Sequence, residues 1–309
     1  MLVENAHRAR SLCYLIAGRR LTLGFPDSET LATDILPDAY LPFRCAPDEG
    51  IPLFELALGE AIAEPQVEPT HVFGQPAMEC RIHRGDAGSY LVSLTDLTTH
   101  RTARMQADAS WSRLQTTLLP HDGSDARMLD FLLMMAFGFA APRSGALLMH
   151  ASVIGLGGKA MLFLGASGTG KSTHAVLWLT HVAGATLVND DNPVVSLTAD
   201  GGATVSGSPW SGKTPCYRQL TMPVTAFVRL EQAPHNNLCQ LGGAHAYAAL
   251  LPSCADMPWD SALHDATCRL VARLASEVIV ARLRCLPDAD AARLSHSLTD
   301  TYIYKEAGV

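Results

Sequence analysis

A nine-residue run, Gly165–Thr173, constrains the fold of this chain more than any other stretch of its sequence. It reads Gly-Ala-Ser-Gly-Thr-Gly-Lys-Ser-Thr and fits the pattern G-x-x-x-x-G-K-[ST], the phosphate-binding P-loop. The apolar run 160–164 precedes it, and the stretch 173–179, which reads as a helix, follows it. The sequence therefore predicts a strand, a glycine loop and a helix in succession, which is the context in which this motif binds phosphate.

The residue types in the run explain why it should bind a nucleotide. Glycines let the backbone curl until successive N–H groups point at phosphate oxygens, and the helix N-terminus adds unpaired N–H groups and partial positive charge. We expect Lys171 to lie between the β- and γ-phosphates and the Ser172 hydroxyl to hold Mg²⁺. The predicted nucleotide-binding residues are Gly165, Ala166, Ser167, Gly168, Thr169, Gly170, Lys171, Ser172 and Thr173.

Composition, charge and cysteine usage exclude several classes of protein and partner. The 309 residues suggest two domains, and 48% hydrophobic with 17% charged residues indicates a packed core. The net charge of −7 and the lack of a basic run argue against a nucleic-acid partner. Eight single cysteines form no C-x-x-C pair, and no signal peptide is evident, so we expect a cytoplasmic protein. The longest apolar run, 131–142, is too short to span a bilayer, so no membrane partner is expected.

The chain divides by pattern into three parts. Residues 1–122 contain short alternating apolar stretches separated by turn residues, which predicts a mostly β, antiparallel N-terminal domain without catalytic residues. Residues 123–144 contain a stretch that is apolar nearly all round, which predicts a buried connecting helix. Residues 145–309 alternate strands and helices around the glycine loop, and we expect them to form the P-loop domain.

Two adjacent carboxylates, Asp190 and Asp191, follow a short apolar strand expected at 185–188. A strand that ends in a carboxylate beside a P-loop is where such enzymes hold Mg²⁺. Two carboxylates permit two roles, because one can bind the cation while the other accepts a proton from a substrate hydroxyl. The alternative is an Asx-rich turn that ends at Pro193.

Three further cationic or titratable residues are candidates. His150 lies on a strand expected at 147–154, where it is either a hydrogen-bonded core residue or a ligand for a divalent metal or an anionic phosphate. Lys213 and Arg218 lie in a Gly/Pro-rich loop, 207–218, and suit phosphates or an acidic substrate, so we assign them catalytic roles. Trp210 in the same loop either caps a pocket or packs in the core.

The three motifs together resemble a known group of proteins. Leu148–Ser152, Leu164–Thr173 and Leu187–Asp191 resemble the corresponding motifs of HPr serine kinase/phosphorylase and of phosphoenolpyruvate carboxykinase. The resemblance covers roughly residues 145–309 and implies an α/β fold. This would be a compact P-loop core with a mixed sheet, joined here to the mostly β N-terminal domain. HPr kinases usually carry an acidic residue after Gly-Lys-Ser. This chain has Thr173 at that position, and in this it resembles the carboxykinases.

The resemblance also implies cofactors and roles. It implies ATP with Mg²⁺ or Mn²⁺, a metal or phosphate role for His150, a metal role for Asp190 and a base or metal role for Asp191. HPr kinases assemble as hexamers, so it also implies a possible homo-oligomer.

The leading hypothesis is an ATP-dependent phosphotransferase that acts on a hydroxyl of a protein or peptide serine or of a small metabolite. The alternatives are a carboxykinase-like lyase acting on oxaloacetate and a non-catalytic nucleotide-sensing module.

Overall fold

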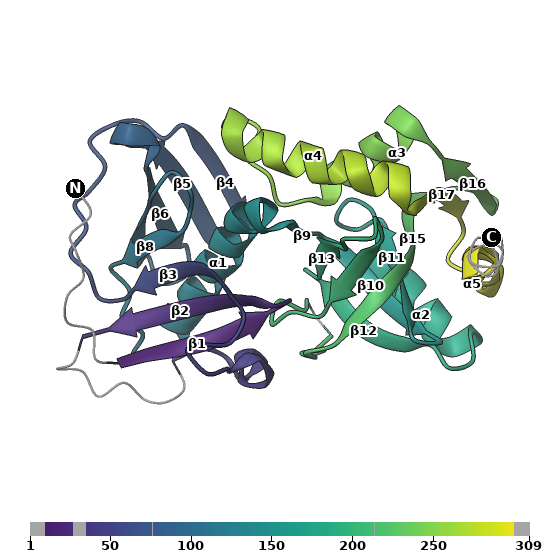
Figure 1. The fold of residues 1–309 in the computed structure, drawn as a ribbon, viewed down its shortest axis with the longest axis horizontal. Coiled ribbons are helices and arrows are strands. Elements are labelled where there is room, and N and C mark those ends of the chain that lie inside the picture. The colour runs from purple at the N-terminus through teal and green to yellow at the C-terminus, as the bar shows by residue number, and fades with distance from the viewer. Residues whose placement is uncertain (1–9, 27–34, 76, 213, 300–309) are drawn as a thin grey trace. The chain divides into compact units, whose positions relative to one another are not determined.

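The computed structural model describes residues 10–26, 35–75, 77–212 and 214–299. Contacts divide the chain into two compact units, Met1–Ala140 and Ala141–Val309 (Figure 1). Within the described residues, no helix combines the length and the hydropathy that crossing a membrane requires.

The first unit contains a mixed β-sheet. Its elements are β1 (Arg10–Ile16), β2 (Arg19–Phe25), η1 (Asp38–Phe43), β3 (Ile51–Ala57), β4 (His71–Gln75), β5 (Met78–Arg84), η2 (Asp86–Gly88), β6 (Tyr90–Asp96), β7 (Thr102–Ala107), β8 (Arg113–Thr116) and α1 (Gly123–Ala140). The described strands form one eight-stranded sheet in the order β1-β2-β3-β8-β7-β6-β5-β4.

The expectation of an antiparallel sheet is wrong at β3. This strand pairs in parallel with β2 on one side and with β8 on the other. A parallel neighbour requires the chain to return to the same end of the sheet before it pairs again, and the connection 26–50 is long enough to do this. The turn residues of Arg84–Gly88 predict a hairpin, which is confirmed because β5 and β6 pair antiparallel across them.

Helix α1 is the apolar helix that the sequence predicts, and it belongs to the first unit. The Asp122 carboxylate caps its start by accepting hydrogen bonds from the backbone N–H groups of Ser124 and Asp125 at 2.8 and 2.9 Å. The Phe131 ring lies 6.3 Å from that of Phe73 in β4. Because almost every face of the helix is covered, its sequence lacks the polar stripe of a surface helix.

The second unit is built around a second mixed sheet. Its strands are β9 (Ala146–Leu148), β10 (Ala151–Leu156), β11 (Lys159–Leu164), β12 (Thr186–Asp191), β13 (Val194–Leu197), β14 (Ala203–Ser206), β15 (Thr221–Gln232), β16 (Asn237–Leu241) and β17 (Ile279–Cys285). Its helices are η3 (Ala141–Ser144), α2 (Lys171–His181), α3 (Gly243–Leu250), η4 (Leu251–Ser253), α4 (Ser261–Glu277) and α5 (Ala289–His296).

In the described residues these strands form a nine-stranded sheet. β10 lies between β12 and β11 and is antiparallel to both, whereas β11, β15 and β17 run in parallel. β15 is long enough for its first residues to pair with β14 while its later residues pair with β17.

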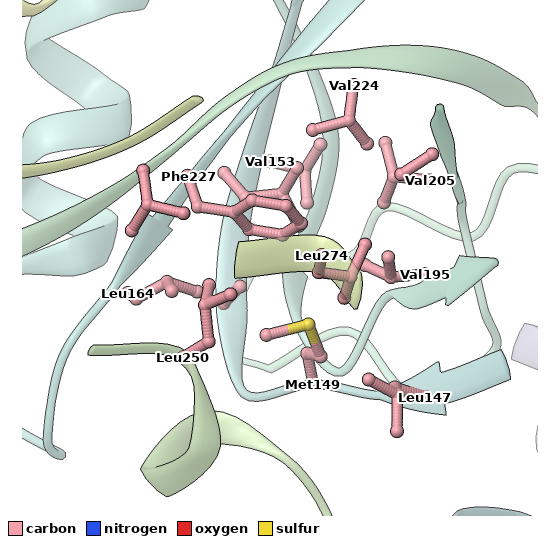
Figure 2. Close-up of a cluster of buried hydrophobic side chains, with 14 of the residues drawn as sticks. Leu147, Met149, Val153, Leu164, Val195, Val205, Val224, Phe227, Leu250 and Leu274 are labelled. Atoms are coloured by element: carbon pink, nitrogen blue, oxygen red, sulfur yellow. The ribbon is translucent and has the colours of Figure 1, made fainter. Parts of the chain in front are cut away.

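The glycine-loop strand β11 is buried on both faces. Ala160, Leu162 and Leu164 belong to the core under α3 and α4, part of which Figure 2 shows. Met161 and Phe163 point the other way, into a core that includes residues of α2. A strand with two buried faces needs apolar side chains at every position, which explains why 160–164 is an unbroken apolar run.

Two local expectations differ from the structure. The strand expected at 147–154 is interrupted, because Met149 forms an isolated bridge with Cys254 and His150 lies outside any strand. Asp190 and Asp191 are the last residues of β12 instead of following it. The sequence also reads as a helix from 288 to about 304; the structure has α5 at Ala289–His296, and positions 300–304 lie outside the described residues.

A buried hydrogen-bond group joins α2 to α5. The Ser295 hydroxyl accepts a hydrogen bond from Trp178 Nε1 at 2.8 Å and donates to the helix carbonyls of Ala291 and Ala292. His174 Nε2 lies 3.0 Å from the same hydroxyl, and the tautomer of the ring decides which of the two groups donates. Burial lowers the pKa of His174 to about 4, so the ring is neutral at pH 7.

We predict that this histidine makes the fold sensitive to acid. Its pKa is lower in the folded chain than its unfolded value of about 6.5, so the unfolded state binds more protons between the two values. Stability is therefore present above about pH 6.5 and is lost as the pH falls toward 4, with a loss of about 2 kcal/mol at pH 5.

Urea unfolding of the full chain at pH 7.5 and pH 5 measures this effect. His174→Gln keeps an amide donor for Ser295 and has no titratable group, so its free energy of unfolding should fall less between the two pH values. Equal falls in the wild type and in this variant would show that His174 is not the acid-sensitive group.

Candidate functional site

The glycine loop between β11 and α2 has a backbone that only glycine adopts readily. Gly168 and Gly170 have φ angles of 80° and 107°, in the left-handed region. Gly170 is the N-cap of α2 and provides no side-chain hydrogen bond to the helix. The first N–H groups of α2 therefore remain available to an anion at the mouth of the loop.

Lys171 lies folded over this loop. It is 8% exposed, and its Nζ donates hydrogen bonds to the carbonyl oxygens of Gly165 at 3.0 Å and Ala166 at 3.3 Å. Burial lowers the pKa of Lys171, while the carboxylates of Asp191 and Asp190 act in the opposite direction. A phosphate is a stronger acceptor for an ammonium group than these carbonyl oxygens are, so the geometry suits exchange of one for the other.

The register of β10 brings three sequence-predicted residues together. Ala151 pairs with Leu164 of β11 on one side and with Asp191 of β12 on the other. His150, the start of the glycine loop and Asp191 therefore lie at the same edge of the sheet. His150 Nε2 is 3.4 Å from Asp191 Oδ1, and their side chains are 41% and 38% exposed.

The two adjacent carboxylates occupy different environments. Asp190 is 8% exposed and accepts a hydrogen bond of 2.5 Å from the hydroxyl of Ser152, its partner in register on β10. Asp191 is more open, and burial raises its pKa while His150 and Lys171 act to lower it. Burial and the charge of Lys171 lower the pKa of His150. The buried carboxylate is fixed in place, and the other faces the edge of the sheet with a histidine beside it.

The loop after β14 returns against β12 and covers this edge. Ser208 donates a hydrogen bond of 2.6 Å to the carbonyl of Asn192 and accepts one from Asn189 Nδ2 at 3.2 Å. Gly212 lies against Asp191, because a Cβ built at position 212 would be 3.3 Å from the Asp191 Cβ. Trp210 is 4% exposed, which favours packing over capping a pocket.

The sequence predicts two catalytic cations in this loop, Lys213 and Arg218. Lys213 lies outside the described residues. Arg218 is exposed, and among the described residues it forms no ion pair with either carboxylate. A Cβ at Gly207 would lie 2.2 Å from the backbone oxygen of Arg218, so glycine is required where the two ends of the loop meet.

Sequence reasoning missed Arg229. It lies on β15 and pairs with Leu164, the last residue before the glycine loop. Its Nη1 is 3.4 Å from the Ser253 hydroxyl, and the Ser253 carbonyl accepts a hydrogen bond of 2.6 Å from the backbone N–H of His150. The Arg229 charge also acts to lower the pKa of Lys171. A single arginine within an otherwise apolar strand was the signal in the sequence.

The oxygen donors at this edge fit a hard divalent cation. Asp190 and Asp191 offer carboxylate oxygens at the end of β12, and Ser172 offers an exposed hydroxyl at the start of α2. In the part of the chain that the structure describes, no group of three or more His, Cys, Asp or Glu side chains could hold a metal ion. Mg²⁺ typically takes one or two carboxylates and completes its shell with water and substrate phosphates, so this donor set suits it.

A family model places this site in a known group of proteins. The model described as "SynChlorMet cassette protein ScmC" matches residues 118–281. The chain belongs to the ScmC family. The part that matches the ScmC model contains the glycine loop, His150, both carboxylates and Arg229, and it ends within β17.

Two other comparisons add little to the ScmC match. No curated protein matches the sequence at a significant level. Among solved structures, the HPr(Ser) kinase/phosphatase from Coxiella burnetii matches at 14% identity with a TM-score of 0.30. The match covers 52% of this chain and 93% of that one. At this TM-score the likeness by itself supports no conclusion about the fold or the reaction.

We predict that Arg229 strengthens anion binding at the glycine loop. Arg229→Gln removes a positive charge beside Lys171 and should weaken the affinity for inorganic tripolyphosphate by about threefold to fivefold. Isothermal titration at low ionic strength measures this change. Arg282→Gln is the matched control, because Arg282 pairs with Arg229 in register but is exposed on β17. Equal weakening in both variants would contradict a local role for Arg229.

Proposed function

We propose that this chain is an ATP-dependent phosphotransferase. It transfers the γ-phosphate of ATP to a hydroxyl group, either of a serine in a protein or peptide or of a small metabolite. The observation that carries the proposal is the convergence of a glycine loop, its folded-over lysine and two carboxylates at one sheet edge. The resemblance of these three motifs to those of HPr kinases supports the same reaction.

The loop and Lys171 would bind the phosphates. The N–H groups at the start of α2 point at the mouth of the loop and donate to phosphate oxygens. Lys171 leaves the carbonyls of Gly165 and Ala166 and places its charge between the β- and γ-phosphates. Phosphoryl transfer depends mainly on positioning the phosphates and neutralising their charge. The N–H groups of the loop would do the first and Lys171 the second.

The two carboxylates would divide the remaining work. Asp190 is held by Ser152 and suits a fixed cation ligand, together with Ser172. Mg²⁺, or Mn²⁺, would neutralise charge on the phosphates when bound. Asp191 is more open and suits acceptance of the proton from the substrate hydroxyl. His150 lies beside Asp191 and would orient this carboxylate or contact the transferred phosphate.

Removal of the Lys171 charge tests the phosphate site. In Lys171→Ala the affinity for MgATP should fall by about 10- to 100-fold, the usual effect of losing a hydrogen bond to a charged group. Lys159→Ala is the control, because Lys159 lies at the opposite end of β11 from the loop. Isothermal titration with MgATP compares the two variants. An unchanged affinity in Lys171→Ala would overturn the assignment of the glycine loop.

Exchange of each carboxylate for its amide tests the division of roles. Asp191→Asn keeps the shape but cannot accept a proton, so the transfer rate should fall by about 10²–10⁴-fold while MgATP affinity changes little. Asp190→Asn should instead weaken MgATP binding. The transfer rate is measured with γ-labelled ATP and a cell extract that supplies acceptors.

Three further results would change or overturn the proposal. The opposite pattern in the two variants would reverse the roles of the carboxylates. ATP binding by the wild type without label transfer to any acceptor would favour a nucleotide sensor. Formation of phosphoenolpyruvate from oxaloacetate and a nucleotide would favour a lyase.

A further inference from the structure

A pocket lies on the other side of the glycine loop from the carboxylates. Its volume is about 680 Å³, and Gly168, Thr169 and Gly170 form part of its lining. The rest of the lining comes from α2 and from residues at and just beyond the ends of β15 and β17. The carboxylates, by contrast, end β12, which is separated from β11 by β10. The glycine loop therefore lies between the pocket and the carboxylates along the sheet edge.

The walls of this pocket are largely apolar. Leu177, Leu230, Leu286 and Pro287 line it, together with the thiol-bearing Cys285. Leu286 is 40% exposed, so part of its apolar side chain is open to a ligand in the pocket. Such a wall suits a flat ring that buries its faces against aliphatic side chains, and the volume lies within the range of small-molecule sites.

The pocket is held in shape by hydrogen bonds that do not use the side chains of its walls. Asn236 accepts a hydrogen bond of 2.8 Å from the backbone N–H of Leu286 and donates one of 2.9 Å to Asp288. Asp288 in turn caps α5 by accepting from the N–H of Ala291 at 2.9 Å. The backbone N–H of Ala233 also donates to the Cys285 carbonyl at 3.1 Å. The segment carrying Leu286 is therefore fixed between β15 and α5 before any ligand arrives.

We infer that this pocket binds the base and ribose of the nucleoside triphosphate whose phosphates occupy the glycine loop. The inference rests on the proposed function and adds the site of nucleoside recognition to it. In open α/β sheets, ligands bind beyond the carboxyl ends of the strands. The parallel strands β11, β15 and β17 all end here. A nucleotide lying along this edge has its base over β15 and β17 and its γ-phosphate toward β12.

Gln232 connects the pocket to the loop. Its amide Nε2 lies 3.4 Å from the Gly168 carbonyl and 3.5 Å from the Thr169 carbonyl. Both distances are at the upper limit for hydrogen bonds, so the amide can turn to a ligand at little cost. This side chain is the polar group best placed to bond the edge of a base or a ribose hydroxyl.

A comparison of MgATP with magnesium tripolyphosphate separates the nucleoside contribution from the phosphate contribution. Isothermal titration of the full chain should show MgATP binding at least about tenfold more tightly, as expected for burial of one leucine-sized apolar contact or more. Ala233→Trp places a large ring in the pocket and should reduce MgATP affinity to that of tripolyphosphate.

Leu286→Ser and Leu179→Ser form a matched pair. The two leucines are 40% and 41% exposed, but only Leu286 lines the pocket. Leu286→Ser should weaken MgATP binding about threefold or more and leave tripolyphosphate binding unchanged, because part of the apolar wall is lost. Leu179→Ser should change neither affinity.

The outcomes distinguish a failure of the pocket inference from a failure of the proposed function. Equal affinities of the wild type for MgATP and tripolyphosphate, or unchanged MgATP affinity in Ala233→Trp, would overturn the pocket inference and leave the phosphate site standing. If the wild type binds neither compound, the proposed function fails together with the inference.

Cysteine alkylation gives a second readout on the unmodified chain. Cys285 lines the pocket, whereas Cys239 is exposed and lies outside the lining. MgATP should slow alkylation of Cys285 by iodoacetamide, as followed by peptide mass mapping, and leave Cys239 unaffected. Tripolyphosphate should protect neither thiol. Alkylation of Cys285 at the same rate with and without saturating MgATP would contradict the inference.

Discussion

The candidate site depends on the register of β10 between its two neighbours. The strand pairs Ser152 with Asp190 and Ala151 with Leu164, and these pairings place the end of β12 beside the start of the glycine loop. A shift of one residue would turn every β10 side chain to the opposite face of the sheet. Ser152 would then leave Asp190, and Val153 would lose its place in the buried core. Core packing therefore fixes the same register that brings the candidate site residues together.

The local features of the second unit could be predicted because each depends on neighbours in sequence. The motif predicts the glycine loop, and the unbroken apolar run before it predicts the strand β11. The run is apolar throughout because both faces of β11 are buried. The sequence also reads as helical at about 243–252 and 260–276, and α3 and α4 lie close to these stretches. The hairpin between β13 and β14 follows from its Asp-Gly-Gly turn.

The features that could not be predicted depend on partners distant in sequence. The parallel pairing of β3 with β2 requires the 26–50 connection, whose sequence carries no pattern that indicates where the chain returns. His150 leaves its strand because the segment around Ser253 takes the place of a strand partner. Arg229 could be assigned to the site only after β15 was placed beside β11. The apolar pocket likewise combines α2 with residues that follow two separate strands.

The contact made by Ser253 has a consequence for how the site can change. Its carbonyl holds the backbone of His150, and its hydroxyl lies within reach of Arg229. A displacement of the short helix η4, which ends at Ser253, would move the imidazole and the guanidinium together. Through Ser253, the connection between α3 and α4 therefore couples the position of the His150 imidazole to that of the Arg229 guanidinium.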